Sequence, residues 1–187
     1  MTSALFASAV QTSYKSNPIP IPDSFLTTPP ADQPKSAVVD FAAVGLPEYV
    51  NALALTVDGA LSPEECKQLI QLAEDSVPRD DGSSAWRPAL VSLGVGWEAP
   101  APGYRVSDRI IWDNQTIADR IWQRCIQAEG IKETLAEVAP DGFVKRKQGG
   151  RWKLSRLNDR LRFLKYSPNE YFKRKAIFAY PSNGTPR

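Results

Sequence analysis

Residues 157–175 read LNDRLRFLKYSPNEYFKRK, and this stretch decides which fold the sequence predicts. From Arg160 to Tyr166 the side chains alternate with the period of two that is typical of a β-strand. One face carries Arg160, Arg162, Leu164 and Tyr166, and the other carries Leu161, Phe163 and Lys165. Ser167-Pro168-Asn169 then predicts a turn, because proline pre-sets φ and asparagine tolerates a left-handed conformation. Tyr171-Phe172 resumes β-favouring residues, so the pattern predicts a hairpin.

The same stretch resembles the strand, turn and strand that lead into the iron site of one oxygenase family. That family is the prolyl 4-hydroxylase-like branch of the iron(II) and 2-oxoglutarate-dependent oxygenases, whose pattern is roughly L-N-x-R-L-R-F-L-x-Y-x-P-G-Q-x-F-x-x-H-x-D. The chain matches this pattern from Leu157 to Phe172, with Asn169-Glu170 in place of Gly-Gln. The resemblance implies that Tyr166 contacts 2-oxoglutarate. An aromatic residue packed on a strand face is the alternative interpretation of Tyr166.

The chain departs from the family at the metal site itself. The resemblance places the first iron-binding histidine at Lys175 and the aspartate at Ile177, and the chain contains no histidine at all. Iron in this class is held by two histidines and a carboxylate, and lysine keeps its proton up to about pH 10. The parent family uses iron(II) and 2-oxoglutarate, with ascorbate as a further candidate. As written, the sequence predicts no cofactor chemistry, no catalytic residue and no metal ligand.

Earlier segments resemble the same oxygenase branch in their order along the chain. They are Trp86-x-Pro88-Ala89, then Arg105-x-Ser107-Asp108-Arg109, then Asp113 before a helix that bears Trp122. The resemblance covers roughly residues 53–174. It implies an α+β fold in which N-terminal helices pack on an incomplete double-stranded β-helix, a jelly-roll sheet. A sheet left incomplete keeps an open edge, so we expect poor solubility in isolation.

Two helices are predicted from their start signals. Ser62-Pro63-Glu64-Glu65 combines an N-cap serine, a proline at the first helical position and the glutamate of a capping box, in a helix that Val77-Pro78 ends. Asp113 or Thr116 can cap the second helix. Its apolar residues at helical spacing are Ile117, Ile121, Trp122, Cys125 and Ile126. Cys66 and Cys125 lie in these two helices and are interpreted as buried thiols rather than a disulfide.

Charge and proline content divide the chain into three parts. Residues 1–36 are rich in Ser, Thr and Pro, a composition that predicts a disordered tail. Residues 37–174 are expected to form the truncated oxygenase-like domain, and residues 175–187 a C-terminal tail that does not resemble the family. Residues 142–187 hold 13 Lys and Arg against two acidic residues, a net charge of +11, whereas residues 1–141 carry −9. A basic block of this kind is typical of a solvated surface, or of a surface that binds an acidic partner or nucleic acid.

These observations leave two function classes open. The first is a truncated member of the oxygenase family, whose parent hydroxylates a peptide or small molecule and which is inactive without its His-x-Asp motif. The second is a non-catalytic binding module that uses the basic C-terminal third to bind an acidic partner or nucleic acid. The chain has neither an apolar run long enough to cross a bilayer nor a recognisable secretion signal, so we expect a cytoplasmic protein without a membrane partner.

Overall fold

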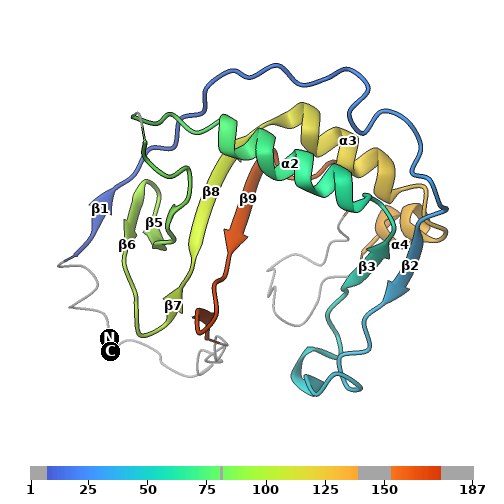
Figure 1. The fold of residues 1–187 in the computed structure, drawn as a ribbon. Coiled ribbons are helices and arrows are strands. Elements are labelled where there is room, and N and C mark those ends of the chain that lie inside the picture. The colour runs from blue at the N-terminus through green and yellow to red at the C-terminus, as the bar shows by residue number, and fades with distance from the viewer. Residues whose placement is uncertain (1–7, 81, 139–152, 174–187) are drawn as a thin grey trace, which may run out of the picture. The chain divides into compact units, whose positions relative to one another are not determined.

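The structure is a computed structural model that describes residues 8–80, 82–138 and 153–173 (Figure 1). It is a mixed α+β protein with a few helices and several small sheets, which confirms the predicted class at that level. The chain divides into two compact units. Of the described residues, the strand unit comprises 8–14, 86–110 and 164–173, and the helical unit comprises 15–80, 82–85, 111–138 and 153–163. Lys175 and Ile177 lie outside the described residues.

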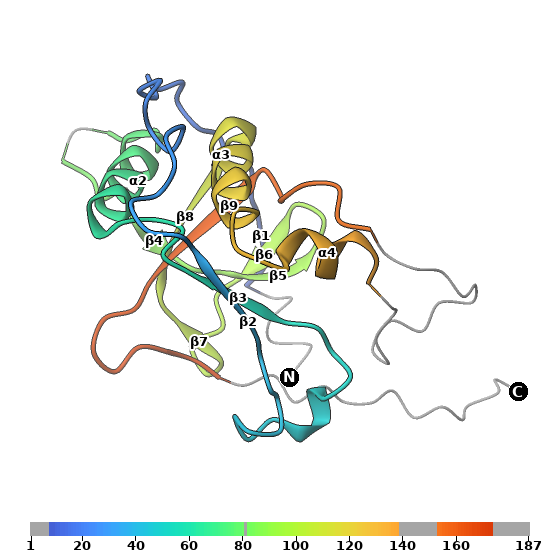
Figure 2. The same cartoon turned by 90° about the vertical axis from the view of Figure 1, so that its right-hand side faces the viewer.

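The helical unit contains the helices α2 (Pro63–Asp75), α3 (Gln115–Cys125) and α4 (Ile131–Ala136) and the 3-10 turn η1 (Pro47–Tyr49). Two views at right angles show α2 and α3 side by side (Figures 1 and 2). A two-stranded antiparallel ribbon joins β2 (Lys35–Val38) to β3 (Leu55–Asp58). None of the helices in the described part has the length and apolar character that crossing a membrane requires.

The start of α2 confirms the predicted capping box. The Glu65 N–H donates to Ser62 Oγ at 3.1 Å, and the Ser62 N–H donates to Glu65 Oε2 at 2.8 Å. Pro63 occupies the first turn, where its missing N–H costs nothing. The helix buries Leu72 and Ala73, but Cys66 is exposed, so the prediction of a buried thiol is wrong there. Cys125 is half-buried, and burial raises the pKa of its thiol.

The cap of α3 differs from both predicted residues. Asn114 is the N-cap, and its Oδ1 accepts from the Ile117 N–H at 2.9 Å. Asp113 is the last residue of the preceding strand, and its carboxylate is bound by Arg160 at 2.7 Å. Since the strand extends through Asp113 and α3 begins at Gln115, the residue between them, Asn114, holds the N-cap position.

The strand unit contains two small antiparallel sheets. Strand β6 (Trp97–Ala99) lies between β1 (Val10–Gln11) and β5 (Val91–Gly94), and β7 (Arg105–Val106) pairs with β10 (Tyr171–Phe172). A third sheet has the order β4 (Arg87–Pro88), β8 (Asp108–Asp113) and β9 (Arg160–Lys165). The last two strands have residues in both units.

The predicted hairpin is wrong in its pairing, although its parts are present. Strand β9 alternates between exposed and half-buried residues over 160–163. In the turn, Asn169 is left-handed with φ of 69°, and the Glu170 N–H donates to the Ser167 carbonyl at 3.0 Å. After this turn, however, β10 pairs with β7 rather than with β9. Periodicity identifies a strand but not its partner, and here a cross-strand contact between Phe172 and Arg105 favours β7.

The N-terminal segment also differs from the expectation of a free tail. Phe25 and Leu26 are 4% and 3% exposed, and short strand β1 pairs with β6. Prolines and small polar residues dominate this segment, but two of its large apolar side chains, Phe25 and Leu26, are buried in the folded chain. Composition alone therefore understates how much of residues 8–36 is packed.

Candidate functional site

Tyr166 is the residue that the resemblance assigns to 2-oxoglutarate. It directly follows the last residue of β9, and its side chain is 43% exposed. Within residues 8–80, 82–138 and 153–173, no three His, Cys, Asp or Glu side chains gather where they could hold a metal ion. Because the sequence also lacks histidine, its residues do not fit the two-histidine, one-carboxylate iron site that the resemblance implies.

The ribbon of β7 and β10 carries exposed aromatic rings beside basic side chains. Phe172 is 51% exposed, and the Arg105 guanidinium carbon lies 5.0 Å from the centre of its ring. Tyr104 meets Phe172 edge-on, with 5.1 Å between the ring centres. We call the surface formed by Tyr104, Arg105, Tyr171, Phe172 and Lys173 the aromatic ribbon. Rings this exposed are not part of a core.

The C-terminal end of the aromatic ribbon repeats the same combination of ring and cation. Tyr171 is 38% exposed, and the Lys173 ammonium lies 5.5 Å from its ring centre. The Tyr171 hydroxyl donates to the Pro102 carbonyl at 2.6 Å, and the Lys173 N–H donates to the Tyr104 carbonyl at 2.9 Å. These two bonds hold the rings in place on a short, two-stranded element.

Arg105 has a donor that the described residues do not use. Its Nε donates to Ser107 Oγ at 3.0 Å, but its Nη2 is buried and has no hydrogen-bond partner in the described part of the chain. A buried donor without an acceptor costs about 1–3 kcal/mol. The guanidinium therefore retains the capacity to bind an additional oxygen.

A buried polar cluster in the strand unit joins the N-terminal segment to the sheet. The Arg109 guanidinium pairs with Glu98 at 2.8 Å, each residue being 9% exposed, and also donates to the Leu90 carbonyl at 3.3 Å. The Tyr14 hydroxyl donates to Glu98 and accepts from Arg109. Burial, followed by the hydrogen bond to Glu98, raises the pKa of Tyr14. These side chains bind one another, so we interpret the cluster as a structural hydrogen-bond network rather than a ligand site.

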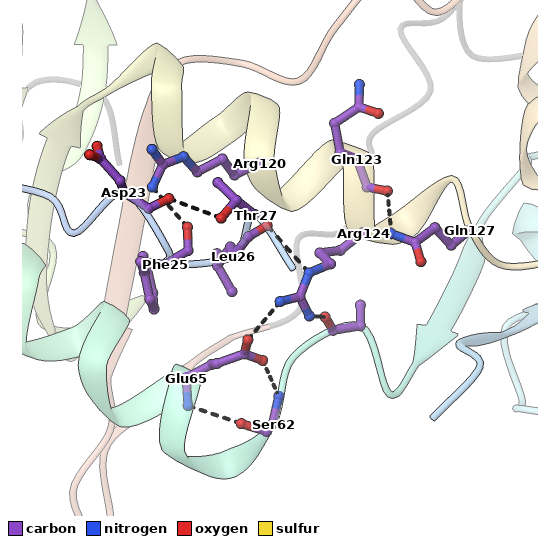
Figure 3. Close-up of polar contacts among 11 residues, drawn as sticks. Asp23, Phe25, Leu26, Thr27, Ser62, Glu65, Arg120, Gln123, Arg124 and Gln127 are labelled. Carbon is purple, nitrogen blue, oxygen red and sulfur yellow. Dashed lines mark hydrogen bonds and ion pairs between the residues drawn. The ribbon is translucent and has the colours of Figure 1, made fainter. Parts of the chain in front are cut away.

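A second buried arginine organises the helical unit (Figure 3). Arg124 is 1% exposed, and its Nη2 pairs with Glu65 Oε1 at 2.7 Å. Its Nη1 donates to the Ala60 carbonyl at 3.2 Å, and its Nε donates to the Leu26 carbonyl at 3.3 Å. One side chain of α3 thereby holds the start of α2, the loop before α2 and the N-terminal segment.

Sequence reasoning assigned no role to Tyr14, Glu98, Arg109 or Arg124. A signal for Arg124 existed, because it lies two helical turns after the buried Ile117 and so falls on the apolar face of α3. A cation on an apolar face needs a buried partner. Nothing in the sequence indicates that this partner is Glu65, which belongs to a different helix.

Comparisons with known proteins add no assignment to this geometry. No family model, no curated protein and no solved structure matches the chain.

Proposed function

We propose that this chain contains part of a prolyl 4-hydroxylase-like oxygenase fold and lacks the iron centre of that family. The observation that carries the proposal is the match over Leu157–Phe172, which spans a strand, a turn and a second strand. The left-handed Asn169 supports it, because the family pattern has glycine at this position and glycine favours positive φ. On this proposal the sheets of the chain correspond to part of a jelly roll.

The proposed fold comes with a loss of chemistry. The parent activity is hydroxylation of a carbon in a peptide or small molecule, with iron(II), oxygen and 2-oxoglutarate. Lys175 and Ile177 stand where that chemistry needs a histidine and an aspartate. A protonated lysine has no free electron pair for a metal, and isoleucine has no donor atom. We therefore propose that the chain is a catalytically silent member of this group.

Restoring two of the missing donors, the histidine and the aspartate of the His-x-Asp motif, tests the proposal. We expect the double variant Lys175→His with Ile177→Asp to bind cobalt(II) at least about tenfold more tightly than the parent chain when 2-oxoglutarate is present. Calorimetry measures the affinity, and the absorption of cobalt reports its coordination. The matched control, Ala176→His with Phe178→Asp, adds the same donors one position along the chain.

The control decides how the result is interpreted. If the control binds cobalt(II) as tightly as the double variant, the register taken from the family pattern is wrong and the proposal fails. It also fails if the parent chain consumes 2-oxoglutarate in a reaction that depends on iron(II), because the unaltered chain would then be an active enzyme.

A further inference from the structure

We propose that the aromatic ribbon is a binding surface for single-stranded nucleic acid. This inference is independent of the proposed oxygenase fold, because it rests only on Tyr104, Arg105, Tyr171, Phe172 and Lys173. The first support is ring exposure, since Phe172 and Tyr171 are 51% and 38% exposed. Exposed rings on an ordered strand form a platform on which unpaired bases stack.

The second support is the charge around the rings. Arg105 and Lys173 each lie beside a ring, and neither forms an ion pair with a residue of the described part. Glu170 is the acidic residue nearest in sequence to β10, and its Oε2 accepts from the Ser167 N–H at 2.7 Å within the turn. Two cations without a carboxylate partner are available to phosphate groups.

The third support is the unused donor of Arg105. Its Nη2 is buried without an acceptor, close to the exposed ring of Phe172. Phosphate oxygen suits the guanidinium, whose fork of donors matches phosphate geometry.

Single-stranded nucleic acid satisfies these features better than an acidic peptide does. A carboxylate-rich peptide would neutralise Arg105 and Lys173 and leave Tyr171 and Phe172 without a partner. A nucleotide chain offers a flat apolar base and a charged phosphate in every repeat. The aromatic ribbon likewise offers two pairs of ring and cation, Phe172 with Arg105 and Tyr171 with Lys173. Paired bases would hide their faces, so the preferred form is single-stranded.

The test measures binding of labelled oligothymidylate and oligouridylate to the full chain by fluorescence anisotropy at low salt. Each contact with a single-strand phosphate contributes about −0.7 to the slope of log affinity against log salt, so two cations predict a slope of about −1.4. Phe172→Ala should weaken binding about tenfold and leave the slope unchanged, because it removes stacking and no charge. Lys173→Gln should weaken binding and reduce the steepness of the slope by about 0.7.

Two control variants remove an apolar side chain and a lysine away from the aromatic ribbon. Val95→Ala removes an exposed apolar side chain elsewhere in the strand unit, and Lys67→Gln removes an exposed lysine from α2. Both should bind as the parent chain does, and circular dichroism should show that all four variants remain folded.

Three results would overturn the inference. One is the absence of binding at low salt. Another is unchanged affinity in Phe172→Ala, which would mean that no base stacks on the ribbon. The third is competition by polyglutamate as effective as that by unlabelled oligonucleotide, which would identify an acidic-peptide site or a general polyanion site instead.

Discussion

Two arginine–carboxylate pairs in the helical unit have the same nitrogen–oxygen distance and opposite surroundings. Arg124 pairs with Glu65 at 2.7 Å, with side chains 1% and 24% exposed. Arg160 pairs with Asp113 at 2.7 Å, and both side chains are 42% exposed. The exposed pair even has the better fork, with Nε to Oδ1 and Nη2 to Oδ2 both at 2.7 Å.

The comparison shows that distance alone does not set the contribution of an ion pair to stability. Water solvates Arg160 and Asp113 in the unfolded chain and still reaches them in the folded one, so little is gained when they meet. Arg124 loses its water entirely and depends on every acceptor that the fold supplies. The buried pair is thus costly to break, whereas the exposed pair contributes little to stability.

The largest expected effect comes from removing the buried cation. Arg124→Met should lower the free energy of unfolding by about 3–5 kcal/mol, because it leaves the Glu65 carboxylate and two buried carbonyls without their donor. Urea unfolding followed by circular dichroism measures the change. Arg120→Met is the matched control on the same helix, since Arg120 is half-buried and, among the described residues, donates only to the carbonyls of Pro22 and Phe25. An equal loss in the two variants would contradict the special role of Arg124.

The pH dependence of stability sharpens the comparison. Burial raises the pKa of Glu65 and is the largest single influence, but the hydrogen bonds from Ser62 and Arg124 together outweigh it, so the pKa lies below its usual value. A lowered pKa in the folded state stabilises the protein above the unfolded pKa of about 4.3, and this stabilisation is lost as the pH falls through the folded value. Stability should therefore decline below about pH 4.3.

Glu65→Gln isolates the contribution of this carboxyl to the acid sensitivity. The variant should be less stable than the parent chain at pH 7 and should lose less of its stability between pH 5 and pH 3, which unfolding curves across that range measure. Asp113→Asn is the comparison variant, because Arg160 lowers the pKa of Asp113 as well but does so in contact with water. If the free energy of unfolding of Glu65→Gln falls as steeply between pH 5 and pH 3 as that of the parent chain, the Glu65 carboxylate does not stabilise the folded state.

The smallest expected effect comes from the exposed pair. Arg160→Ala should lower the free energy of unfolding by about 0–1 kcal/mol, and this loss should shrink further in high salt. A double-mutant cycle with Asp113→Asn measures the coupling free energy between the two side chains. A coupling that approaches the effect of Arg124→Met would show that this pair is far less hydrated than its exposure indicates.

Local sequence signals predicted several elements well. The capping box at Ser62, the strand over residues 160–165 and the left-handed turn at Asn169 all depend on residues close together in the chain. Short-range geometry settles such features, because the atoms that make the hydrogen bonds are only a few residues apart.

Features that depend on distant partners were predicted poorly or not at all. The pairing of β10 with β7 and the burial of Phe25 each depend on residues far away in sequence. The same holds for the aromatic ribbon, because Arg105 and Phe172 meet only when β7 and β10 pair.

The sequence by itself determined the local caps and turns, the basic C-terminal third and the absence of histidine, since these follow from composition and from neighbouring residues. The α+β class was implied by the family resemblance, and the structure agrees with it at that level. Only the tertiary structure decided which cations are buried and which rings are exposed. Burial and exposure depend on which other segments pack around a side chain. Those segments are distant in sequence, so a local sequence pattern does not identify them.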